Sequence, residues 1–232
     1  RITWSELAGS SKLSGKVEGR CTASCFWSGM MVDKKIGRCL LKESLLAQTK
    51  RMLHRYDLKV RKKLGQHFLI DEEVLPLITS AAEITPTDII MEIGPGLGIL
   101  TEELARQAGQ VIAIELDSKL AAILKQRLAS FENVTIINKS VLHIDPTTLL
   151  LQPKTSSLPT TGPYKIVANL PYYITSPALR HFLAASVKPK IIVVMVQKEV
   201  AEAIVATPGQ RSVLSTSVQF YGKPIIVSYV PA

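Results

Sequence analysis

Cysteine and tryptophan are missing from most of this chain. All three cysteines (Cys21, Cys25 and Cys39) and both tryptophans precede residue 40 of the 232. A body without cysteine cannot be a disulfide scaffold, and it is typical of a protein of the reducing cytoplasm. The Cys21-x₃-Cys25 spacing has no partnering Cys/His cluster further along, so we expect no metal site.

Long hydrophobic runs are also missing. No stretch reaches the roughly 18 apolar residues that a membrane span requires, and the longest, Ile191–Val196, has the length of one buried strand. Residues 1–29 lack the apolar core of a secretory signal. We therefore expect a cytoplasmic monomer with no membrane partner. A hydrophobic content of 47% is enough for one substantial core.

Acidic residues are scarce in the N-terminal third, which carries the whole positive excess. Residues 1–70 hold 15 Lys/Arg against 5 Asp/Glu, whereas residues 71–232 hold 13 against 14. Such a basic arm can neutralise phosphates and bind RNA in a salt-dependent way, although a solvated basic helix is the simpler alternative. The candidate RNA-binding residues are Lys50, Arg51, Arg55, Lys59, Arg61, Lys62 and Lys63.

A glycine-rich turn follows the apolar run Ile89–Ile93. Gly94 and Gly96 belong to a G-x-G-x-G pattern, where a backbone without Cβ atoms can approach a ligand closely. A dinucleotide fingerprint would need a further glycine at the place of Ile99, so NAD is disfavoured. The next strand ends on Glu115, about twenty residues on, where an acid can accept hydrogen bonds from ribose hydroxyls. This order favours an adenosine-containing ligand such as S-adenosyl-L-methionine.

The segment Asn169-Leu170-Pro171-Tyr172 suits chemistry on an exocyclic amino group. The Asn169 side-chain oxygen and the Leu170 carbonyl could each accept one amino proton, with Pro171 fixing the backbone between them. Tyr172 would stack on a flipped base. Methyl transfer then depends on positioning and electrostatics rather than on a strong base. An ordinary turn after a strand is the alternative interpretation.

Alternating strand and helix patterns predict an α/β fold with a doubly wound, mostly parallel sheet. Its ligand crevice should lie at the carboxyl ends of the strands. The expected strands are 89–93, 111–115, 134–138, 165–169, 190–196 and 225–230. The expected helices are 71–82, with an acidic first turn, and 100–108, 118–129, 146–151, 176–185, 199–206 and 213–221. The last of these also permits a strand, and residues 152–163 are expected to be a loop.

The glycine turn, Glu115 and the Asn169–Tyr172 segment, with Lys63–Leu69 upstream and Gln197–Ala201 downstream, resemble the ribosomal RNA adenine dimethyltransferase family. The resemblance begins near Ser44. It implies a Rossmann-like class I methyltransferase that uses S-adenosyl-L-methionine to dimethylate N6 of two adjacent adenosines near the 3′ end of small-subunit (16S) ribosomal RNA. The partner would be the small ribosomal subunit precursor. The implied donor-binding residues are Gln66, His67, Leu69, Gly94, Gly96, Glu115, Ser140 and Asn169.

This chain differs from the family pattern in two places. The family has a Gly-Asp pair where the chain has Lys139 and Ser140, and a neutral replacement for the acid should weaken donor binding by about 1–3 kcal/mol. The chain stops at Ala232, before the place of a further loop, strand and helical domain. We therefore expect residues 71–232 to form an incomplete methyltransferase domain that lacks the C-terminal helical domain.

Residues 44–70 are expected to form the basic RNA-binding arm and the start of a cofactor lid. Residues 1–43 are left unassigned, either as a flexible extension or as sequence upstream of a start at Met30, Met31 or Met52. Two other functions stay open. One is an erythromycin-resistance type methyltransferase of 23S ribosomal RNA, which Leu170 disfavours because those enzymes usually carry Ile there. The other is a non-catalytic ribosome assembly factor that binds ribosomal RNA.

Overall fold

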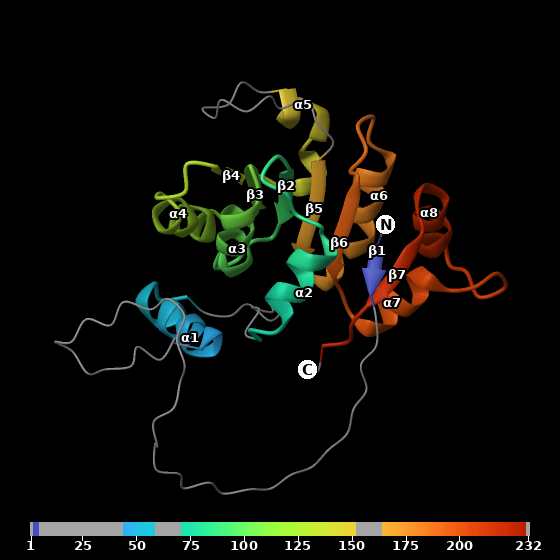
Figure 1. Cartoon of the computed structure of the whole chain (residues 1–232), viewed down its shortest axis with the longest axis horizontal. Helices are drawn as coiled ribbons and strands as arrows, with labels where there is room; N and C mark the ends of the chain where they lie inside the picture. Colours follow the sequence, from blue (N-terminus) through green and yellow to red (C-terminus); the bar gives the residue numbers. More distant parts are fainter. Residues whose placement is uncertain (1, 5–43, 59–70, 152–163, 231–232) are drawn as a thin grey trace, which may run out of the picture.

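A five-stranded parallel sheet forms the centre of the protein (Figure 1). The computed structural model describes residues 2–4, 44–58, 71–151 and 164–230. The strand order is β4-β3-β2-β5-β6, and every neighbouring pair is parallel. Because the order reverses direction beside β2, the sheet is doubly wound, as predicted. The strands are β2 (Ile89–Ile93), β3 (Gln110–Glu115), β4 (Val134–Asn138), β5 (Tyr164–Asn169) and β6 (Ile191–Met195).

Helices connect these strands at the positions that the sequence predicts, with ends that differ by a few residues. The helix over 213–221, for which a strand was also open, begins with a capping box: Ser212 Oγ accepts a hydrogen bond from Ser215 N at 3.2 Å. The helices are α1 (Leu45–Arg55), α2 (Val74–Ala81), α3 (Ile99–Gln107), α4 (Ser118–Arg127), α5 (Pro146–Leu151), α6 (Thr175–Ala184), α7 (Lys198–Val205) and α8 (Val213–Tyr221), with 3₁₀ turns η2 (Val141–His143) and η3 (Tyr172–Ile174).

Both faces of the sheet are buried, which explains why the central strands are apolar at nearly every position. Side chains such as Ile90 and Val111 pack against α2 and α3. The alternate residues, including Met91 and Ile114, pack on the other face against Leu179 of α6 and its neighbours. The site residues at the strand ends are therefore supported by a core on each side.

Helix α2 begins three residues later than the predicted helix. Asp71 Oδ1 accepts a hydrogen bond from Glu73 N at 2.9 Å, which closes a short turn in place of the first helical turn. Glu72 Oε1 accepts a hydrogen bond from Leu45 N at 3.2 Å, which connects this turn to the first residue of α1. The three acids at 71–73 thus form the turn before the helix, and α2 starts at Val74.

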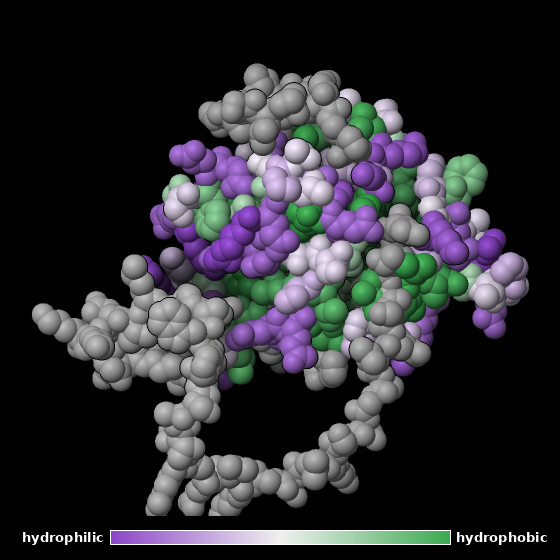
Figure 2. Space-filling model, in the orientation of Figure 1, coloured by the Kyte–Doolittle hydropathy of each residue, from purple (hydrophilic) through white to green (hydrophobic). Residues whose placement is uncertain are grey.

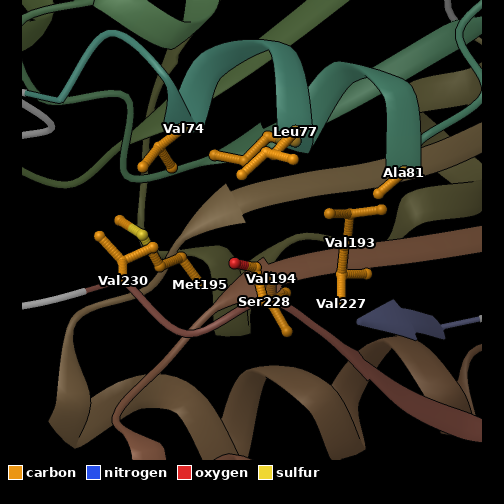
Figure 3. A pocket seen from close by; sticks show the side chains of 10 residues that line it. Val74, Leu77, Ala81, Val193, Val194, Met195, Val227, Ser228 and Val230 are labelled. Carbon is orange, nitrogen blue, oxygen red and sulfur yellow. The ribbon is translucent and has the colours of Figure 1, made fainter. Parts of the chain in front are cut away.

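Strand β7 (Pro224–Val227) does not join the five-stranded sheet as its sixth strand, which the sequence predicted. It pairs in parallel with β1 (Ile2–Trp4), a segment that the sequence left unassigned. An apolar groove separates β7 from β6, and Figure 3 shows Val74 and Leu77 of α2 pointing into it toward Met195.

Apolar side chains reach the surface on this side of the molecule, as the space-filling view shows (Figure 2). Val227 and Val230 complete the groove below α2. In the part of the chain that the structure describes, no helix is long and apolar enough to cross a membrane.

A buried ion pair joins the amino ends of β2 and β5. Lys165 Nζ donates to Asp88 Oδ2 at 2.8 Å and to the Glu83 carbonyl at 2.5 Å, and the Lys165 side chain is 3% exposed. Burial alone would raise the pKa of Asp88, but hydrogen bonds from Lys165 and Thr85 outweigh it and lower that pKa. The pair therefore stabilises the amino-terminal ends of these two central strands. The sequence motifs lie at the opposite, carboxyl-terminal ends.

Removing either partner should leave an uncompensated buried charge. We expect Lys165→Met or Asp88→Asn to lower the free energy of unfolding by up to about 3–5 kcal/mol, and the double variant to lose less than the sum. The Asp88 contribution is present above its ordinary pKa of 3.8 and is lost as the pH falls through the lowered folded value. Urea unfolding measures both effects, with the exposed Lys190→Met as control. Equal losses in Lys165→Met and Lys190→Met would contradict this role.

Candidate active site

The glycine turn between β2 and α3 has the backbone that the sequence predicts. Gly94, Gly96 and Gly98 all have positive φ, at 67°, 58° and 77°. Gly94 N donates to the Ile114 carbonyl at 3.0 Å, which attaches the turn to the end of β3. Gly98 is the N-cap of α3, so the turn leads directly into the helix.

Glu115, at the end of β3, is hydrogen-bonded to the glycine turn. Its Oε2 accepts from Gly96 N at 3.2 Å, and its Oε1 accepts from Asp117 N at 2.9 Å. The side chain is 7% exposed, and burial raises its pKa although these two hydrogen bonds oppose the shift. Each carboxylate oxygen keeps a second lone pair, so Glu115 can still accept ribose hydroxyls as the sequence predicts.

The second motif lies against the glycine turn. A Cβ placed on Gly94 would be 3.7 Å from Pro171 Cδ and 3.9 Å from the Asn169 carbonyl oxygen. Leu170 buries its side chain in the core and donates its N–H to the Met195 carbonyl at 3.1 Å. The Pro171 carbonyl accepts from Ile174 N and from Thr175 Oγ1 at 3.1 and 3.3 Å. Asn169 and Pro171 are thus fixed between β6, α6 and the turn.

The end of β4 lies beside the end of β3. Asn138 Nδ2 donates to the Glu115 and Leu116 carbonyls at 2.8 and 3.1 Å, which locks the ends of β3 and β4 together. Ser140 follows two residues later, half-buried, as the N-cap of η2. Gly94, Gly96, Glu115, Ser140 and Asn169 therefore meet at the carboxyl ends of four neighbouring strands.

The described part of the basic arm is helix α1. Leu45 and Met52 are buried with Leu97 of the glycine turn, so α1 packs beside the donor side of the crevice. Lys50, Arg51 and Arg55 lie exposed along the helix, away from this buried face. Arg55 lies over the ring of Tyr56 at 5.6 Å from its centroid. The other candidates for this region, Lys59, Arg61, Lys62, Lys63, Gln66, His67 and Leu69, lie outside the described residues, as does the side chain of Tyr172.

Two residues of the site escaped the sequence analysis. Glu92, in the middle of β2, is 2% exposed, and its Oε2 has no hydrogen-bond partner among the described residues. Its pKa is raised to about 8, mainly by burial and in smaller part by the nearby Glu115 carboxylate, while Thr101 partly opposes the shift. Arg127 of α4 donates to the Leu97 carbonyl in the turn. The signal for Glu92 was an acid within an otherwise apolar strand, whereas Arg127 had no local signal.

Comparison with known proteins agrees with this geometry. The profile of the family "Ribosomal RNA adenine dimethylase" matches residues 57–232. Ribosomal RNA small subunit methyltransferase A of Dehalococcoides mccartyi strain 195 is 52% identical over 188 residues, 81% of this chain and 62% of that protein. A solved dimethyladenosine transferase from Plasmodium falciparum has a TM-score of 0.54 at 30% identity, over 66% of this chain and 52% of its own. The 23S rRNA methyltransferase ErmE has a TM-score of 0.52 at 31% identity, over 63% and 54%.

The sheet order, counted from β2 as 3-2-1-4-5, and the glycine turn with its acid define the class as Rossmann-like methyltransferases. The family match covers three quarters of the sequence and the solved structures share this fold. This chain belongs to the ribosomal RNA adenine dimethylase family. It spans about three fifths of the length of the curated relatives that it matches.

The fit of α4 against the glycine turn should make Gly98 sensitive to substitution. A Cβ at Gly98 would lie 2.5 Å from Leu124 Cδ2, whereas a Cβ at Gly209 meets nothing within 4 Å. Both glycines have positive φ, so Gly209→Ala controls for backbone strain. We expect Gly98→Ala to lose about 1–3 kcal/mol more unfolding free energy than Gly209→Ala, measured in urea. Equal losses of unfolding free energy in the two variants would mean that the Leu124 side chain of α4 moves to make room for the added methyl group.

The buried Glu92 should make stability fall as the pH rises. The unfolded carboxyl ionises near its ordinary pKa of 4.5, whereas the folded one keeps its proton up to about 8. Between these values the unfolded chain binds fewer protons, so the free energy of unfolding decreases with pH. We expect Glu92→Gln to remove more than about 1 kcal/mol of this decrease. Urea unfolding across that pH window tests this, with exposed Glu132→Gln as control. Parallel pH profiles for wild type and Glu92→Gln would contradict the assignment.

Proposed function

We propose that this chain transfers methyl groups from S-adenosyl-L-methionine to N6 of two adjacent adenosines near the 3′ end of small-subunit ribosomal RNA, forming dimethyladenosine. The observation that carries the proposal is the contact between the two motifs: Gly94 of the glycine turn lies directly against Pro171 and the Asn169 carbonyl. Membership of the adenine dimethylase family and the name of the 52% identical relative support it.

The residues at the strand ends fit the methyl donor. Glu115 retains lone pairs for the ribose hydroxyls, and the half-buried backbone of Gly94 and Gly96 allows close approach. Ser140 would accept one hydrogen bond from the adenine amino group. Gln66, His67 and Leu69 would complete the donor side. When bound, S-adenosyl-L-methionine supplies a methyl group on a positively charged sulfur.

The acceptor side follows from the chemistry of adenine, whose amino nitrogen is a poor nucleophile because its lone pair is delocalised into the ring. Asn169 and the Leu170 carbonyl would accept the two amino protons and draw the nitrogen toward tetrahedral geometry. The hydrogen bonds made by Leu170 N and by the Pro171 carbonyl fix the conformation of this segment. Acceptors fixed in this way would position the amino group and so lower the activation barrier of methyl transfer. Tyr172 would stack on the flipped base.

Ribosomal RNA would be held by the basic arm. The exposed Lys50, Arg51 and Arg55 lie on a helix packed beside the glycine turn, so phosphates bound there would lie close to the crevice. Lys59, Arg61, Lys62 and Lys63 would extend this surface. We place the reaction in the cytoplasm, on a small-subunit precursor, with the protein acting as a monomer.

A second candidate function is methylation of 23S ribosomal RNA. The similarity to the solved structure of the 23S rRNA methyltransferase ErmE, with a TM-score of 0.52 and 31% identity, favours it. Leu170 in the second motif disfavours it. The position of the modified nucleotide separates the two functions.

Transfer of labelled methyl from S-adenosyl-L-methionine into small ribosomal subunits that lack dimethyladenosine tests the proposal. We expect labelled dimethyladenosine in small-subunit RNA and none in large-subunit RNA. Asn169→Ala should reduce transfer at least about 100-fold because one acceptor of the amino protons is lost. Tyr172→Ala should do the same through lost stacking, while Tyr173→Ala, which removes an exposed neighbouring ring, should leave transfer near wild type.

The outcomes distinguish the candidate functions. Label in large-subunit RNA alone would establish the second candidate. Salt-dependent RNA binding without donor binding or transfer, in a folded protein, would indicate a non-catalytic assembly factor. Undiminished turnover in Asn169→Ala would overturn the role assigned to that side chain.

A further inference from the structure

Arg127 connects three elements around the glycine turn. It extends from the last turn of α4, and its side chain is 18% exposed. Its Nη1 donates to the Leu97 carbonyl within the turn, and its Nη2 donates to Glu102 Oε2 on α3 at 2.6 Å. A single guanidinium therefore ties α4 to both the turn and the helix that follows it.

The turn is consequently held from two directions. Glu115 accepts the N–H of Gly96, and Arg127 donates to the carbonyl of the next residue, Leu97. A peptide carbonyl in such a turn lies outside the regular hydrogen bonding of strand and helix, so a charged donor stabilises it more than water would. Together the two contacts fix the Pro95–Gly96 peptide through its N–H and the Leu97–Gly98 peptide through its carbonyl.

Arg127 is suited to this bridging by its shape and its surroundings. A guanidinium offers donors in a planar fork, so it can bind a carbonyl and a carboxylate at once, which a lysine ammonium does less well. Burial lowers the pKa of Arg127, and the Glu102 carboxylate opposes the shift and keeps the group charged. Arg106 also pairs with Glu102, but its side chain is 53% exposed, and its two ion pairs, to Glu102 and Glu103, lie within α3.

We propose that Arg127 is a positioning residue for donor binding: by bridging the Leu97 carbonyl to Glu102, it holds the Leu97–Gly98 peptide in the conformation that receives S-adenosyl-L-methionine. The inference rests on the proposed function for the identity of the ligand. Arg127 acts through the turn and has no part in the chemistry of transfer. Its loss should therefore weaken donor affinity and leave the rate at saturating donor nearly unchanged.

Two variants matched at Glu102 test the proposal. Arg127→Gln removes the contact to Leu97 and one ion pair to Glu102. Arg106→Gln removes the other ion pair to Glu102, together with a pair to Glu103, and leaves the turn untouched. Amide hydrogen exchange of peptides covering residues 94–99, without ligand, reports on the turn itself. We expect exchange about 10-fold faster in Arg127→Gln and within about 2-fold of wild type in Arg106→Gln.

Donor affinity provides the second readout. By calorimetry with S-adenosyl-L-methionine we expect Kd to rise about 10-fold in Arg127→Gln, with KM for the donor rising alike and kcat changing less than about 2-fold. Arg127→Lys, which keeps a cation near Leu97, should recover part of the affinity. Glu102→Gln, which keeps the contact to Leu97, should lose stability while retaining most of the affinity.

Equal exchange in Arg127→Gln and Arg106→Gln would overturn the proposal, as would faster exchange with unchanged donor affinity. If Arg127→Gln does not fold, Arg127→Lys against Arg106→Gln decides by the same two readouts. A folded wild type that binds no donor would refute the proposed function instead. In that case the exchange comparison alone decides whether Arg127 fixes the turn.

Discussion

The parallel register of β2 with both of its neighbours is the constraint on which the site depends. Ile93 is paired with Ile114 on one side and with Ala168 on the other, so the next residues, Gly94, Glu115 and Asn169, necessarily emerge together. A shift by one residue would turn each side chain to the opposite face of the sheet. The apolar cores on both faces prevent such a shift, because they require each strand to bury alternate residues against different helices.

Buried charged side chains have different partners at the amino and carboxyl ends of the strands. At the amino ends, Lys165 and Asp88 neutralise each other and form a closed, structural pair. Toward the carboxyl ends, Glu115 accepts hydrogen bonds from backbone N–H groups and Glu92, the fourth residue of β2, has a raised pKa; neither carboxylate forms an ion pair among the described residues. Acceptor groups that are held by the backbone keep capacity for a ligand, whereas a paired cation would compete with it. This difference separates a structural end of the sheet from the end at which we propose that the methyl donor binds.

Local patterns predicted most elements because the central strands and their helices have strong signals. Short apolar runs rich in Ile and Val, followed by glycine, an acid or Asn, mark β2, β3 and β5. In the structure Asp117 caps two N–H groups at the start of α4. The errors arose where two local structures were close in energy. Asp71 could begin a helix or close a turn, and the chain after Pro224 could pair with β6 or lie apart from it. Such choices depend on neighbours that are distant in the sequence.

The amino-acid sequence by itself determined the class of fold, the glycine turn, its acid and the Asn-Leu-Pro-Tyr segment, because each is a short stretch whose residue types dictate backbone shape or hydrogen bonding. Tertiary structure decided which groups these stretches meet. The contact of Gly94 with Pro171, the bond from Arg127 to Leu97 and the raised pKa of Glu92 join residues or environments far apart in the chain. They arise from the packing of whole helices on the sheet. A local stretch can show that an acid such as Glu92 lies in an apolar strand, but it does not show which groups from other elements surround it.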